Sequence, residues 1–163
     1  MGAGKTTIGR QLAKLLGLEF LDSDHEIETH TGVNIPLIFE IEGEEGFRER
    51  ESAMLDTLTR REHIILATGG GAVLRAQNRE FLKTRGTTIY LHATVDDLLQ
   101  RTRFDRNRPL LQTADPRAKL EALMQEREPL YREVATLVID TAQGNPKKIA
   151  NLIAKKLKQQ SQN

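Results

Sequence analysis

Apolar positions along the chain follow two periods, one typical of helices and one of strands, and the two alternate. Ile8, Leu12 and Leu16 fall on one face of a helix that would end at Gly17. Residues 18–22 then form a short apolar run that ends in an acid, which predicts a strand. The chain therefore begins with a helix followed by a strand, and the same alternation continues toward the C-terminus.

Compact apolar runs predict three further strands, over residues 63–68, 87–93 and 136–141. Amphipathic patterns predict the remaining helices, over residues 23–31, 34–41, 44–61, 75–85, 95–102, 117–128 and 146–158. Such alternation predicts an α/β domain with a parallel sheet in the middle layer and helices on both faces. We expect a single domain over residues 1–163 and ligands at the carboxyl ends of the strands.

Composition narrows the class of protein. The chain has 163 residues, with 24 Lys plus Arg against 23 Asp plus Glu, and neither Cys nor Trp. The charge balance gives no general attraction to nucleic acid or to anionic membranes, and a disulfide framework is excluded. No apolar run approaches the roughly 20 residues that span a bilayer. We expect a monomeric cytoplasmic protein without nucleic-acid or membrane partners.

The first seven residues, MGAGKTT, contain the second half of a phosphate-binding loop. In such a loop, glycines let backbone N–H groups surround phosphate oxygens at the positive end of the following helix. Lys5 would reach the β- and γ-phosphates, and the hydroxyl of Thr6 would bind Mg²⁺. The alternative is an N-terminus that contains glycines by chance, which the amphipathic helix that follows at once disfavours.

A phosphate-binding loop normally follows a buried strand, and here the first glycine of the pattern and that strand would both precede Met1. In such folds this strand lies in the middle of the sheet. We therefore expect Met1 to be an internal residue of the loop, and the strand to be encoded upstream of it. A chain that starts at Met1 is expected to have low stability and weak nucleotide binding.

Two acids follow the predicted strand 18–22. Asp22 and Asp24 are two residues apart, and in extended backbone such side chains face the same side. One could hold Mg²⁺, and the other could accept a proton or a hydrogen bond from a substrate hydroxyl. Asp22 or Ser23 could instead simply cap the next helix.

A glycine triplet and several arginines are further candidates. Residues 69–71 are all glycine after an apolar strand, which favours close approach of the backbone to a ligand over a simple turn. The polar segment 103–116 contains two prolines and several arginines, including Arg108, and is predicted to be a lid. Arg48 and Arg127, in helical segments, could bind an anion or lie on the surface.

Six short stretches occur together in a recognisable order: GAGKTTIGRQLA, DSD, IFEIEGEEGFRERE, TGGGAV, RNRPLL and REPLY. In this combination the chain resembles bacterial shikimate kinases, a P-loop group related to nucleoside monophosphate kinases. The resemblance extends from Met1 to about residue 140. It implies a P-loop kinase fold, with substrate-binding helices over about 23–61, and transfer of the γ-phosphoryl group of ATP to the 3-hydroxyl group of shikimate.

The resemblance also implies which residues bind ATP and Mg²⁺. Lys5 and Arg108 would be catalytic groups on the phosphates, Thr6 would bind Mg²⁺, and Asp22 would assist the metal through water. Arg101 and the loop around Gly144 would flank the adenine. The implied nucleotide-binding residues are Gly2, Ala3, Gly4, Lys5, Thr6, Thr7, Arg101, Arg108, Gly144 and Pro146.

On the substrate side, the resemblance implies that Asp24 contacts the shikimate hydroxyls and is the candidate general base. Arg48 and Arg127 would bind the shikimate carboxylate, in keeping with the bidentate preference of guanidinium groups. The remaining implied substrate-binding residues are Gly69, Gly70 and Gly71, through their backbone, and Phe39 and Phe47.

Two other functions remain open. A sugar-acid kinase of the gluconate type shares the phosphate loop and an anionic polyol substrate. A non-catalytic nucleotide-binding module would keep the loop without needing the two acids. Turnover with shikimate and gluconate, together with direct binding measurements, distinguishes these alternatives.

Overall fold

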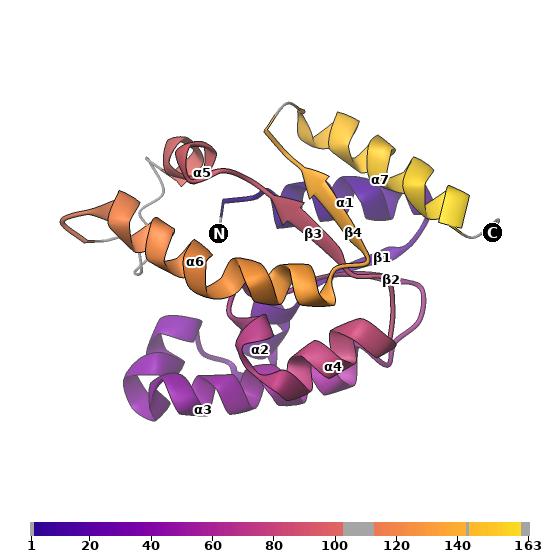
Figure 1. The fold of residues 1–163 in the computed structure, drawn as a ribbon. Coiled ribbons are helices and arrows are strands. Elements are labelled where there is room, and N and C mark those ends of the chain that lie inside the picture. The colour runs from indigo at the N-terminus through magenta and orange to yellow at the C-terminus, as the bar shows by residue number, and fades with distance from the viewer. Residues whose placement is uncertain (1, 103–112, 143, 161–163) are drawn as a thin grey trace.

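The computed structural model describes residues 2–102, 113–142 and 144–160 of the 163 residues. Strands and helices alternate through most of these residues, as the hydrophobic pattern predicts (Figure 1). The strands are β1 (Glu19–Asp22), β2 (Ile64–Ala67), β3 (Ile89–His92) and β4 (Leu137–Asp140). The α-helices are α1 (Lys5–Leu16), α2 (Ser23–Thr31), α3 (Ile35–Leu58), α4 (Ala76–Thr84), α5 (Val95–Thr102), α6 (Pro116–Val134) and α7 (Pro146–Gln160), and η1 (Ala72–Leu74) is a 3-10 helix.

The strands pair in parallel, but as two separate pairs. In β1–β2, Asp22 lies opposite Ala67, and in β3–β4, His92 lies opposite Asp140. Both pairs therefore end in register at their carboxyl ends. The segments that follow β1 and β2 leave the sheet side by side, which brings the acids near residue 22 close to the glycines after residue 67.

Helices cover both faces of the strands, which confirms the predicted three-layer α/β class. On one face, α1 and α7 pack together around Ile8, Leu12 and Ile153, against partly buried residues of β2 and β3. On the other face, α6 contacts α4 and η1, with Leu55, Ala72 and Phe81 in the core there. No helix in the described ranges is long and apolar enough to cross a membrane.

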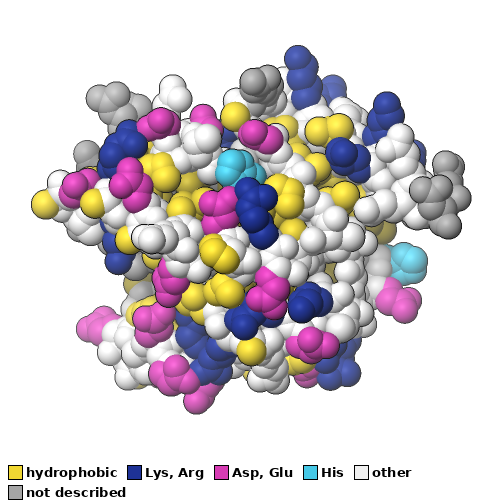
Figure 2. All heavy atoms as spheres, viewed as in Figure 1, with side chains coloured by type: hydrophobic (Ala, Val, Ile, Leu, Met, Phe, Trp, Pro, Cys, Tyr) yellow, Lys and Arg dark blue, Asp and Glu magenta, His cyan; other side chains and the backbone are white. Residues whose placement is uncertain are grey.

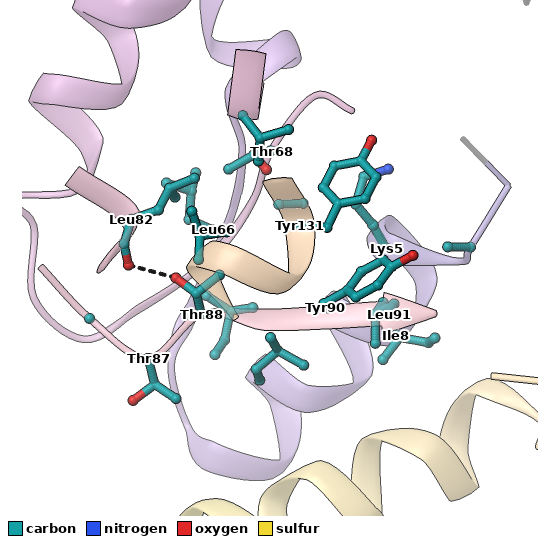
Figure 3. A pocket seen from close by; sticks show the side chains of 18 of the residues that line it. Lys5, Ile8, Leu66, Thr68, Leu82, Thr87, Thr88, Tyr90, Leu91 and Tyr131 are labelled. Carbon is teal, nitrogen blue, oxygen red and sulfur yellow. Dashed lines mark hydrogen bonds between the residues drawn. The ribbon is translucent and has the colours of Figure 1, made fainter. Parts of the chain in front are cut away.

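A cavity of about 560 Å³ separates β2 from β3 and divides the two strand pairs (Figure 3). Its walls come from β2, from β3 including Tyr90, from Ile8 and Leu12 of α1, and from Tyr131 of α6. The facing edges of β2 and β3 have no strand partner among the described residues. This cavity occupies the middle of the sheet, between the two strand pairs.

Of two predicted helix boundaries, one is confirmed and one is wrong. The predicted break between residues 41 and 44 is present, because the backbone of α3 leaves the helical region at Gly43 (φ 70°, ψ −177°). The predicted end near residue 128 is wrong, since α6 continues through Pro129 to Val134. This extra turn places Tyr131 on the same helical face as Arg127.

Candidate active site

The phosphate loop leads directly into α1, as predicted. Gly2 (φ 69°) and Gly4 (φ 87°) both have left-handed backbones that favour glycine, and Gly4 is the N-cap of α1 without a side-chain cap. No side chain therefore caps this helix end, and the N-terminus of a helix favours an anion. Ala3 and Lys5 line the cavity, and Lys5 begins the helix, while Thr6 and Thr7 are exposed in its first turn.

Thr6 and Asp22 lie side by side, although 16 residues separate them. The Thr6 hydroxyl donates to Oδ2 of Asp22 at 3.4 Å. The other oxygen of Asp22, Oδ1, accepts from the backbone N–H of Asp24 at 3.0 Å and caps α2. Capping and metal binding are therefore compatible at this side chain. A hydroxyl and a carboxylate at this spacing suit Mg²⁺, which takes few protein ligands and several from phosphates and water.

Asp24 lies in the first turn of α2, so the prediction that both acids share one side of an extended strand is wrong. The two acids are close because Asp22 caps the helix that carries Asp24. Burial, with the charges of Asp22 and Glu51, raises the pKa of Asp24 to about 6, against the opposing cations Lys5 and Arg48. Its Oδ1 is buried without a hydrogen-bond partner among the described residues. A carboxylate held this way can accept a hydrogen bond or a proton from a ligand.

The glycine segment, residues 69–71, lies against three charged side chains. A Cβ at Gly69 would lie 2.9 Å from Oδ1 of Asp24 and 3.0 Å from Oε1 of Glu51. A Cβ at Gly71 would overlap the guanidinium of Arg48. Side chains are excluded at both positions because charged groups pack directly on the backbone. Steric exclusion thus explains glycine at these two positions, in addition to any close approach of a ligand.

Arg48 is held in place by Glu51. Nη1 of Arg48 donates to Oε2 of Glu51 at 2.7 Å, and the side chains are 11% and 1% exposed. Burial raises the pKa of Glu51, while the hydrogen bond from Arg48 opposes that effect. Nε of Arg48 and Oε1 of Glu51 remain buried without partners. The pair therefore keeps hydrogen-bonding capacity that no described protein group uses.

Arg127, on α6, reaches the same region from the opposite wall. Its charge acts on both Glu51 and Tyr131, and its Nε is buried without a partner in the part of the chain that the structure describes. Phe47 is buried below Arg48, with its ring 4.7 Å from that of Phe39 between centroids. Phe39 itself is 37% exposed. The two predicted arginines and the aromatic pair thus belong to one cluster with Asp24 and the glycine segment.

Arg101 joins the phosphate loop to the segment after β4. Its guanidinium donates to Thr141 at 3.0 Å (Oγ1) and 2.8 Å (backbone oxygen), and to the carbonyl of Gly2 at 3.5 Å. Pro146 begins α7, and Gly144 packs against Ile149 next to it. The adenine role of this loop stays a prediction. Arg108 and most of the predicted lid, at 103–116, lie outside the described residues.

Sequence reasoning missed three polar residues of this cluster. Glu51 holds Arg48, Ser23 accepts from the N–H of Gly69 at 3.3 Å, and Tyr131 donates to the carbonyl of Gly70 at 2.7 Å. Glu51 follows Arg48 by three residues and Tyr131 follows Arg127 by four, so both share a helical face with a predicted arginine. That spacing is the signal that could have found them.

Comparisons with known proteins agree with this geometry. The family model described as shikimate kinase matches residues 1–158. A shikimate kinase of Cupriavidus pinatubonensis is 61% identical over 157 residues, which are 96% of this chain and 82% of that protein. One of Halorhodospira halophila is 56% identical over 160 residues, 98% of this chain and 90% of that protein.

Among solved structures, the shikimate kinase from Acinetobacter baumannii in complex with shikimate superposes with a TM-score of 0.94. It is 57% identical, and the match covers 98% of this chain and 89% of that one. The shikimate kinase from Aquifex aeolicus has a TM-score of 0.85 at 30% identity, covering 99% of this chain and 94% of the other. Since the family model and these relatives span nearly the whole chain, the chain belongs to the shikimate kinase family.

Proposed function

We propose that this chain transfers the γ-phosphoryl group of ATP to the 3-hydroxyl group of shikimate. The observation that carries this proposal is a group of buried polar atoms around the glycine segment, on Asp24, Arg48, Glu51 and Arg127, that have no partner among residues 2–102, 113–142 and 144–160. Shikimate is a small carboxylate with several hydroxyl groups. It needs cations, a carboxylate acceptor and backbone donors, and this cluster supplies all three.

The carboxylate of shikimate is assigned to the two arginines. Guanidinium groups bind carboxylates bidentately, and a buried guanidinium with a fixed partner loses little freedom on binding. Glu51 fixes Arg48 through Nη1, and Glu44 accepts from Nη2 at 3.3 Å, while Nε has no partner among the described residues and is open to a ligand. Phe39 and Phe47 would form the apolar wall beside it, and the whole of 23–61 would act as the substrate-binding part of the domain.

Asp24 is assigned to the reacting hydroxyl. With a pKa of about 6 it is mostly ionised at neutral pH and accepts a hydrogen bond or the departing proton. The phosphate loop with Lys5 is assigned to the ATP phosphates, and Arg108 to the same phosphates from the proposed lid. In phosphoryl transfer, positioning and neutralisation of charge supply most of the rate enhancement.

Thr6 and Asp22 would hold Mg²⁺ together with the ATP phosphates, since their oxygens lie 3.4 Å apart. The ion would neutralise phosphate charge at the point of transfer. Arg101 and the Gly144–Pro146 loop are assigned to the adenine side. We also propose a monomer that binds small molecules only; positive and negative side chains are interspersed on the face in Figure 2, without a large patch of one sign.

The test is turnover with ATP and Mg²⁺, using shikimate and gluconate in parallel and ³¹P NMR to identify the phosphorylated product. We expect transfer to shikimate, and a large loss for Arg48→Ala. Arg50→Ala is the matched control, because Arg50 lies on the same helix but is exposed and paired with Glu42. Faster turnover of gluconate, or tight binding of ATP and shikimate without product, would overturn the proposal.

A further inference from the structure

We propose that Tyr131 is a positioning residue, which fixes the direction of the free backbone donors in the glycine segment; this rests on the proposed function. Tyr131 lies on α6, and its hydroxyl donates to the carbonyl oxygen of Gly70 at 2.7 Å. This bond joins segments 61 residues apart in sequence. It connects the helix that carries Arg127 to the backbone beside Asp24 and Arg48.

The other hydrogen bonds of the glycine segment show which of its backbone donors remain available. The N–H of Gly69 donates to Ser23 at 3.3 Å, and the carbonyls of Gly69 and Gly71 accept from Ala72 and Leu74 at 3.1 and 3.0 Å. The N–H groups of Gly70 and Gly71 have no hydrogen-bond partner within the described ranges. These two N–H groups are the donors available to a ligand.

Tyr131 acts on one of these donors through peptide geometry. A trans peptide directs its N–H opposite to its carbonyl. Because the Gly70 carbonyl points to Tyr131, the N–H of Gly71 in the same peptide points away from α6. Without the hydroxyl, this peptide could rotate, since glycine has no side chain to restrict φ and ψ. The tyrosine thus fixes a donor without touching the substrate itself.

The ring of Tyr131 is itself held in place. It packs against the ring of Tyr90 on β3, with centroids 5.1 Å apart and planes inclined by 33°. Both tyrosines line the cavity with Lys5 (Figure 3). Burial raises the pKa of Tyr131, and the charge of Arg127 and its hydrogen bond to the hydroxyl oppose that effect without reversing it. The hydroxyl therefore stays protonated as a donor. The Tyr90 hydroxyl, in contrast, is buried without a partner among the described residues.

The stacked pair gives a matched experiment, because each tyrosine can lose its hydroxyl while both rings remain. For Tyr131→Phe we expect kcat/KM for shikimate to fall about three- to tenfold, the usual size for one hydrogen bond. The KM for ATP should change by less than about twofold. Tyr90→Phe should match the unsubstituted protein in both, since its hydroxyl makes no hydrogen bond with a described residue.

A second measurement reports the geometry without any substrate. In ¹H–¹⁵N NMR spectra of the apo protein, the Gly71 amide should shift in Tyr131→Phe and stay in place in Tyr90→Phe. Equal kinetics for the two variants, or an unchanged Gly71 amide, would overturn the positioning role. If the unsubstituted protein fails to phosphorylate shikimate while the Gly71 amide still shifts, the proposed function fails and the structural role stands. A thermal midpoint for each variant confirms that both are folded.

Discussion

Replacing Asp24 by asparagine should make the apo protein more stable while nearly abolishing turnover. Asparagine has nearly the same shape and carries no charge, so it removes the cost of burying the Asp24 carboxylate and its repulsion by Asp22 and Glu51. The pKa of Asp24 in the folded protein is about 6, against 3.8 for an ordinary aspartate. At about 1.4 kcal/mol for each pH unit, this difference corresponds to at most roughly 3 kcal/mol.

The sign follows from proton binding. Because the folded-state pKa of Asp24 is raised, the native protein binds more protons than the unfolded chain between about pH 4 and pH 6. Its stability therefore falls as pH rises through this window, and the full cost of the buried charge applies above about pH 6. In Asp24→Asn this contribution disappears. The pKa of Glu51 is also raised, so its contribution to stability has the same sign, and Glu51 remains in the variant. The test therefore compares the pH dependence of the unfolding free energy in the two proteins.

The assay is equilibrium urea unfolding in metal-free buffer from pH 4.5 to 8. Far-UV circular dichroism is the suitable probe, because the chain has no Trp. We expect Asp24→Asn to gain up to about 3 kcal/mol at pH 7.5, with the gain shrinking toward pH 4.5. Glu40→Gln, an exposed carboxylate on α3, is the control and should change little. A gain that is absent at pH 7.5, or the same at every pH, would refute the reasoning.

Turnover of Asp24→Asn should fall by about 10²-fold or more with ATP binding retained, and near-normal kcat would remove Asp24 from the mechanism. Arg48→Ala should weaken shikimate binding by about 2–5 kcal/mol, because a desolvated charge pair is lost; an unchanged shikimate KM contradicts this. Gly71→Ala should also raise the shikimate KM, since the new Cβ overlaps the Arg48 guanidinium, whereas Gly86→Ala meets open space and should behave normally. Thr6→Val should raise the Mg²⁺ concentration for half-maximal turnover about tenfold or more, and Thr6→Ser should not; equal values for both would exclude the hydroxyl as a metal ligand.

Much of the fold follows from local patterns in the sequence. The strands are short apolar runs, helices such as α1 and α7 are clearly amphipathic, and glycines such as Gly17 and Gly32 end helices in left-handed conformations. The end of α6 was missed because Pro129 resembles a helix stop. Proline lacks an N–H and disfavours the helical conformation of the residue before it, yet the helix continues to Val134 through tertiary contacts with α4 and η1.

The site was harder to predict than the fold. Asp24 and the glycine segment could be predicted because they follow predicted strands, and Arg48 because its residue type suits an anionic ligand. The partners Glu51 and Tyr131 have only their helical spacing to an arginine as a signal. Glu51 holds Arg48 from three residues away but also packs against the distant Gly69, and Tyr131 bonds the distant Gly70; a single sequence does not encode which helical faces meet.

The cavity between β2 and β3 has a consequence for the response of the protein to hydrostatic pressure. The cavity of about 560 Å³ per molecule corresponds to roughly 340 mL/mol of space, part of which is open to solvent, whereas unfolding of ordinary globular proteins changes the volume by about 20–100 mL/mol. The volume change on unfolding scales with the void rather than equalling it, so this figure is an upper bound. Pressure should therefore unfold this chain more readily than a well-packed domain of the same length. Because compression leaves covalent bonds intact, the pressure at which half the protein unfolds would measure how stable the packing of the two strand pairs around this cavity is.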